Sequence, residues 1–200
     1  MHVGAYAIGE TTLEFAPGDG RPFYHFALLA PGNRFDAALE WARARVEVLH
    51  NTKTGETVFD FSFWDACAFY FHDPAGNIVE VIAHHGIGER DAEGAFAGTE
   101  LLGLSELGLV GDTLSTAATL ERDLGLEVWD GDAHEFAFVG ERAHTLILCP
   151  PGRGWLPTGR AAEPHPVEAL LAGSREGEAL LEGGLHRIRS AQPGRTSPPS

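Results

Sequence analysis

The chain has 200 residues, of which 44% are hydrophobic, and its 14 basic and 29 acidic residues give a formal charge of −15. This length and apolar fraction are typical of a globular protein with one large or two small domains. The acidic balance argues against nucleic acid or an anionic membrane surface as a partner. We expect a cytoplasmic protein, because no signal peptide or membrane-spanning stretch is visible and Cys67 and Cys149 resemble buried free thiols.

The first half of the chain predicts a hairpin followed by one strand, one helix and three strands. Residues 5–16 alternate around a turn and predict the hairpin. A strand follows at 23–29, and Asn33 can cap a helix that runs to about residue 46. The next three strands are expected at 58–64, 66–71 and 78–83.

The same order of elements returns after a polar, Gly-rich linker at 86–100. Asp112 or Thr113 can cap the second helix, and Gly125 can end it. The predicted elements are a strand at 104–110, a helix at 114–124, and strands at 126–129, 135–139 and 145–149. The chain therefore contains an internal repeat.

The most informative stretch is the aromatic and apolar segment from Phe69 to Ala83, which predicts two strands joined by the turn Asp73-Pro-Ala-Gly-Asn77. One carboxylate, Glu80, interrupts the apolar second strand, and a buried carboxylate is costly unless it is paired or bound to metal. An aromatic strand, an Asp-Pro-x-Gly-Asn turn and an Ile-Val-Glu-Val strand resemble the signature of the vicinal oxygen chelate superfamily. This superfamily includes glyoxalase I, extradiol ring-cleaving dioxygenases and the bleomycin-resistance proteins.

The resemblance implies an α+β fold of paired βαβββ units that form a cup of curved sheet. Two late strands are also expected, at 167–171 and 185–188. The expected division is a remnant hairpin of an incomplete unit at 1–20, a first complete unit at 21–85, the linker at 86–100, a second unit at 101–150, a loop and C-terminal extension at 151–189, and a disordered tail at 190–200. The incomplete first unit would leave a sheet edge through which a homodimer could form.

The resemblance also implies that His25, Glu80 and Glu106 bind one divalent metal ion, with Mn, Fe, Zn and Ni as the candidates. Taken singly, each residue could be a core histidine or a surface carboxylate, but His25 and Glu106 occupy equivalent places in the two units. The place of the family's fourth ligand falls in the apolar run 145–148. Three protein ligands would leave open positions, which suit catalysis better than a closed structural site.

Other residues could contact a substrate. Either Glu80 or Glu106 could leave the metal and act as a general base. Arg153 and Trp155 lie in a Pro- and Gly-rich loop that could serve as a lid, and His84 shares a strand face with Glu80. The alternatives are a loop simply packed by its tryptophan and a solvated histidine at a strand end.

Two functions follow from these residues. The first is a metal-dependent enzyme, a lyase, isomerase or ring-cleaving oxygenase, whose small substrate chelates the ion through adjacent oxygens while the ion acts as a Lewis acid. The second is a non-catalytic binding protein of the bleomycin-resistance type. The three polar residues favour the enzyme, because a binder without metal has no reason to keep them inside apolar strands.

Overall fold

A computed structural model describes residues 4–18, 20–173 and 175–192. The chain forms two compact units. The first contains the described residues up to 107 together with 142–145 and 154–160, and the second contains the remainder. These two units do not follow the predicted division into two repeats, and the repeat boundaries stay a prediction. Among the described residues, neither helix has the length and apolar character that crossing a membrane requires.

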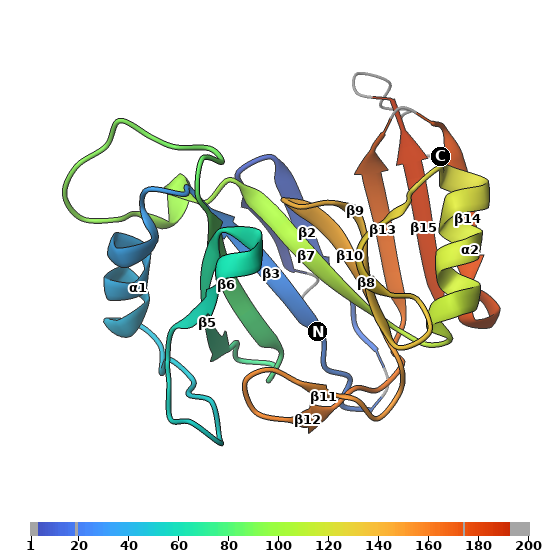
Figure 1. Cartoon of the computed structure of the whole chain (residues 1–200), viewed down its shortest axis with the longest axis horizontal. Helices are drawn as coiled ribbons and strands as arrows, with labels where there is room; N and C mark the ends of the chain where they lie inside the picture. Colours follow the sequence, from blue (N-terminus) through green and yellow to red (C-terminus); the bar gives the residue numbers. More distant parts are fainter. Residues whose placement is uncertain (1–3, 19, 174, 193–200) are drawn as a thin grey trace. The chain divides into compact units, whose positions relative to one another are not determined.

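The first unit is built on a mixed sheet with the strand order β4-β5-β6-β3-β7. Strands β3 and β6 are parallel, and the other neighbours are antiparallel. The strands are β3 (His25–Ala30), β4 (Phe59–Phe61), β5 (Ala66–His72), β6 (Ile78–His84) and β7 (Gly103–Val110), of which β7 continues into the second unit. Helix α1 (Phe35–Arg43) lies alongside β5 and β6 in Figure 1. The predicted α+β class is confirmed.

Strands β3 and β6 are buried along their whole length, and their two faces differ. One face packs against Ala38, Leu39 and Ala42 of α1. The strand residues of that core are Phe26, Leu28, Ala30, Phe69, Val79, Val81 and Ala83. Because side chains alternate along a strand, residues 25 and 27 of β3 and residues 78, 80 and 82 of β6 point to the opposite face. That second face carries the predicted metal ligands.

The N-terminal hairpin is confirmed as β1 (Gly4–Ile8) and β2 (Thr11–Phe15). Its turn docks on the chain just before β7, where Glu10 N donates to the Leu102 carbonyl at 3.0 Å. The side chain of Thr11 accepts from Leu104 N at 3.0 Å. The hairpin is therefore part of the first unit, and dimerisation stays a prediction.

Two local predictions need correction. The predicted strand 58–64 is a strand only in β4, because the 3₁₀ helix η1 (Ser62–Trp64) turns the chain and ends at Asp65 with φ 52°. Asn33 does not cap α1, whose N-cap is Arg34 without a side-chain bond. The Asn33 amide instead exchanges two hydrogen bonds with the Arg90 backbone, at 2.8 and 3.1 Å.

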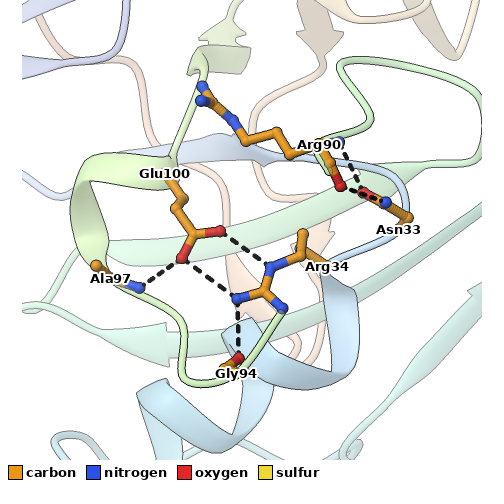
Figure 2. A network of polar contacts seen from close by, with 6 residues as sticks. All are labelled: Asn33, Arg34, Arg90, Gly94, Ala97 and Glu100. Atoms are coloured by element: carbon orange, nitrogen blue, oxygen red, sulfur yellow. Dashed lines mark hydrogen bonds and ion pairs between the residues drawn. The ribbon is translucent and has the colours of Figure 1, made fainter. Parts of the chain in front are cut away.

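The predicted linker is fastened to the first unit, as Figure 2 shows. The Arg34 guanidinium donates to the Glu100 carboxylate at 3.0 Å and to the Gly94 carbonyl at 3.0 Å. Glu100, in the 3₁₀ helix η2 (Gly98–Glu100), also accepts from Ala97 N at 2.8 Å. Phe96 inserts its ring into the core beside α1. These contacts fix the segment that leads into β7 and therefore help to position Glu106.

The second unit contains helix α2 (Thr113–Leu124), in which Asp112 caps the first turn by accepting from Ser115 N at 2.9 Å. Gly125 ends the helix with φ 69°, so both predicted helix ends are confirmed. Strand β10 starts in the first unit and continues into the second, where it lies next to β9, which in turn pairs with β8. Their bounds are β8 (Val128–Asp132), β9 (Phe136–Glu141) and β10 (His144–Cys149).

The second unit also contains a C-terminal sheet of the order β13-β15-β14, with β13 parallel to β15 and β14 antiparallel to it. The strands are β13 (Val167–Ala172), β14 (Gly177–Leu181) and β15 (His186–Ala191), with the 3₁₀ helix η3 (Glu182–Gly184) before β15. Strand β14 was not predicted. The predicted disordered tail is wrong at residues 190 and 191, which belong to β15, and residues 193–200 lie outside the described part of the chain.

Candidate metal centre

The Asp-Pro-x-Gly-Asn turn brings His25 and β6 into register. Asp73 accepts hydrogen bonds from Ala75 N and Asn77 N, both at 2.9 Å, and from the Asn77 amide at 2.7 Å. Asn77 in turn accepts from Tyr24 N at 2.9 Å, at the start of β3. The turn therefore holds the first residue of β3 beside the first residue of β6, where His25 pairs with Ile78.

The same neighbour fixes the imidazole of His25. Nδ1 lies 3.1 Å from the carbonyl oxygen of Ile78, which can only accept, so Nδ1 carries the proton. Nε2 is then the unprotonated nitrogen, and it lies 3.5 Å from Oε2 of Glu80. A ligand nitrogen with its lone pair directed at a carboxylate is suited to share a cation with it.

Glu80 and Glu106 lie on either side of Ala27. Ala27 pairs with Glu80 across the parallel β3–β6 ladder and with Glu106 across the antiparallel β3–β7 ladder. A β-bulge follows at once between Ala27 and Leu28. The methyl group of Ala27 is small enough to let both carboxylates extend over it toward each other.

The three side chains converge on one point. One ligand atom from each of His25, Glu80 and Glu106 lies within 4.8 Å of the other two. All three residues are buried, with 6%, 2% and 4% of their surface exposed. Among the described residues this is the only such group of three or more histidine, cysteine or acidic side chains.

The electrostatics of the group favour a cation. Burial raises the pKa of Glu80 well above its usual value, and the charge of Glu106 raises it further, while a hydrogen bond from Tyr70 opposes the shift. Burial raises the pKa of Glu106 to about 7 and lowers the pKa of His25 to about 4. At neutral pH, His25 is therefore neutral and cannot compensate the carboxylates. No Lys or Arg forms an ion pair with either one among the described residues.

The donor set fits a divalent ion. A neutral imidazole and two carboxylates offer one nitrogen and several oxygens, a combination that Mn²⁺, Fe²⁺, Zn²⁺ and Ni²⁺ all accept. Two buried carboxylates with no counter-charge are unfavourable unless they are protonated or bound to a cation. The site therefore has the ligands and the charge that a metal ion requires.

Trp155 is the predicted substrate residue that the structure brings to this group. It belongs to β11 (Gly154–Trp155), its ring centroid lies 4.7 Å from that of His25, and it is buried. The segment 154–160, which carries Trp155, is held in the first unit by contacts of its last residue, Arg160. Arg160, in β12 (Arg160–Ala161), places its guanidinium 3.4 Å from the Phe23 ring centroid and donates to the Gly76 carbonyl at 3.0 Å.

The other two predicted substrate residues have different surroundings. Arg153 belongs to the second unit, where its guanidinium lies 3.6 Å from the ring centroid of Phe136. His84 is the last residue of β6 and is fully buried, so it is not a solvated strand end. It lies about 13 Å from Glu80 along the strand. Burial and the charge of Arg142 lower its pKa to about 4. Substrate contacts by these residues stay predictions.

Sequence reasoning missed Tyr70. This residue pairs with Glu80 across the β5–β6 ladder, and burial together with the charge of Glu80 raises the pKa of its hydroxyl well above the usual value. The register of the hairpin could have identified it, because the turn at 73–77 determines which residue of β5 lies opposite Glu80.

Comparison with solved structures identifies the fold. A candidate dioxygenase from Bacillus subtilis matches with a TM-score of 0.50 and 14% identity, over 85% of this chain and 62% of its own. Glyoxalase I from Zea mays matches with a TM-score of 0.41 and 16% identity, over 68% of this chain and 48% of its own. No family model matches the sequence, and no curated protein does either. The chain thus spans 62% of the first of these structures and shares its fold, which confirms the predicted dioxygenase-like architecture.

Proposed function

We propose that this protein is a metal-dependent enzyme whose small substrate chelates a divalent ion through two adjacent oxygen atoms. The observation that carries the proposal is the convergence of His25, Glu80 and Glu106 within 4.8 Å inside an apolar sheet. A bound divalent ion would act there as a Lewis acid and stabilise negative charge on the substrate oxygens. The description of the Bacillus subtilis structure as a candidate dioxygenase is consistent with this class of chemistry.

The chain's own residues have distinct parts in such a reaction. His25, Glu80 and Glu106 would hold the ion, and three protein ligands leave positions for substrate oxygens. Either Glu80 or Glu106 could leave the ion and then accept and return a proton as a general base. Trp155 would supply an aromatic surface beside His25 and limit the entry of water.

Metal binding is the decisive test. The purified protein would be stripped of metal and titrated with Mn²⁺, Fe²⁺, Co²⁺, Ni²⁺ and Zn²⁺ by calorimetry. We expect one tight site per chain, which Glu80→Ala abolishes. The matched control is Glu14→Ala, because Glu14 is an exposed carboxylate of the same unit and its removal should leave the site intact.

Activity assays on the loaded protein would follow. Aromatic vicinal diols and α-hydroxycarbonyl compounds are the first substrates to test, because both present adjacent oxygens to a metal ion. If none of these ions binds tightly, the enzyme proposal fails, and a non-catalytic small-molecule binding protein becomes the better description. The cytoplasmic location and the homodimer remain part of the proposal, and sedimentation would test the dimer.

A further inference from the structure

The central strand β5 carries three consecutive aromatic residues that face two different environments. Phe69 belongs to the core beside α1, and Phe71 packs against the same core. Tyr70 lies between them and, because side chains alternate along a strand, points to the opposite face. The only hydroxyl of the three is therefore directed at the face that carries Glu80.

Packing alone does not account for this hydroxyl. The Tyr70 ring makes an edge contact with Phe59 at 4.9 Å between centroids and lies 6.2 Å from the His25 ring. A phenylalanine would keep both ring contacts. A buried hydroxyl is unfavourable unless it is hydrogen-bonded. Tyr70 is 2% exposed and pairs with Glu80 across the β5–β6 ladder, which places the Glu80 carboxylate where it can accept from the hydroxyl.

His25 and Glu80 each have a neighbouring polar group that could orient the side chain. The carbonyl of Ile78 orients the His25 ring, so that Nε2 faces Glu80. Tyr70 lies opposite Glu80 in the β5–β6 register and is therefore placed to orient the Glu80 carboxylate in the same way. Such outer partners fix the orientation of a ligand and, when removed, typically weaken metal binding by about 10–100-fold.

We propose that Tyr70 is a positioning residue of the metal centre, whose hydroxyl donates to the Glu80 carboxylate and determines which oxygen of that carboxylate faces the ion. The inference rests on the proposed metal site. It adds a fourth residue to that site, one that does not contact the ion itself. In the absence of the hydroxyl, the Glu80 side chain could rotate, and its two oxygens would compete for the ion.

The test uses Co²⁺, because its visible absorption reports the number and geometry of its ligands. Tyr70→Phe removes one oxygen atom and keeps the ring. We expect Co²⁺ to bind about 10–100-fold more weakly and its absorption spectrum to change. The matched control is Tyr6→Phe, since Tyr6 is 56% exposed and belongs to the N-terminal hairpin. This control should bind Co²⁺ as the unmodified protein does.

A second variant separates positioning from packing. Phe59→Leu removes the ring that contacts Tyr70 but leaves the hydroxyl in place. We expect Phe59→Leu to lower the melting temperature of the metal-free protein with little change in the Co²⁺ spectrum, whereas Tyr70→Phe should alter the spectrum at nearly unchanged melting temperature.

The outcomes distinguish the two proposals. If the unmodified protein binds Co²⁺ and Tyr70→Phe binds it with the same affinity and spectrum, the role of Tyr70 is refuted and the metal site stands. If the unmodified protein does not bind Co²⁺ or any other divalent ion, the metal site is refuted and the role of Tyr70 falls with it.

Discussion

The sheet of the first unit and the C-terminal sheet share one pairing scheme but bury different residues. In both, the first strand is parallel to the last and the middle strand is antiparallel to it, as β3, β5 and β6 show on one side and β13, β14 and β15 on the other. Strands β3 and β6 are buried on both faces, whereas along β13 and β15 exposed residues alternate with buried or half-buried ones. The C-terminal sheet keeps both of its carboxylates, Glu168 and Glu178, on its exposed face.

This difference indicates why the two buried carboxylates are present. The C-terminal sheet achieves the same pairing with apolar residues such as Ile188 and Ala179 on its buried face, so the pairing itself does not require buried carboxylates. Glu80 and Glu106 are costly to bury, as their raised pKa values indicate. A cost that folding does not require is best explained by a function at that place.

The largest expected effect lies in the C-terminal sheet. Ile188 is fully buried in the central strand β15, and Ile188→Ala would leave a cavity. We expect a loss of about 2–5 kcal/mol in the free energy of unfolding, measured by urea denaturation. Leu180→Ala on the exposed face is the control, because Leu180 is 57% exposed and should have little effect. Equal effects of the two substitutions would contradict the assignment of the faces.

On the face that carries the predicted metal ligands, a substitution should raise the free energy of unfolding rather than lower it. In the folded protein the pKa of Glu106 is about 7, above its unfolded value, so wild-type stability is lost as pH rises from about 4 through 7. Glu106→Gln removes this titration and should stabilise the metal-free protein at pH 8 by up to about 3 kcal/mol. Below pH 4 the titration of Glu106 should make no difference between the stabilities of the two proteins. Urea denaturation across this pH range is the measurement.

Glu14→Gln is the control for this titration, because Glu14 is exposed in the same unit. With saturating metal the sign should reverse, since Glu106→Gln then loses a ligand and with it the stabilisation that a bound ion confers. If Glu106→Gln is less stable than the unmodified protein both with and without metal, the view that the buried Glu106 carboxylate destabilises the metal-free protein is refuted.

The sequence allowed a large part of this structure to be predicted, for physical reasons. Alternation and the Asp73–Asn77 turn predicted the β5–β6 hairpin, and Asp112 and Gly125 predicted both ends of α2, because these signals are local. Glu80 was conspicuous because a charge inside an apolar strand is rare.

The errors arose where the decisive partner is distant along the chain. Asn33 bonds to Arg90 rather than to the first turn of α1, and Tyr70 meets Glu80 only through strand register. The segment 86–100 resembled a free linker because its composition is polar and Gly-rich. Its attachment depends on Arg34, more than fifty residues earlier.

The smallest expected effect on stability concerns the arginine that fastens segment 86–100. Two arginines make similar two-nitrogen contacts with a glutamate: Arg34 with Glu100 in the first unit, and Arg187 with Glu178 on the C-terminal sheet. The side chains of the first pair are 8% and 17% exposed, and those of the second pair are 46% and 38% exposed. Exposed pairs contribute little because water and salt screen them.

We therefore expect Arg34→Ala to cost about 2 kcal/mol, since it also leaves the Gly94 carbonyl without this donor. Arg187→Ala should leave stability unchanged within measurement. Hydrogen exchange adds a local readout: in Arg34→Ala the amides of residues 94–101 should lose protection, because the Glu100 carboxylate then holds only the Ala97 amide. If both arginine variants are neutral and the segment stays protected, the burial of Phe96 rather than the Arg34 contacts fastens it to the first unit.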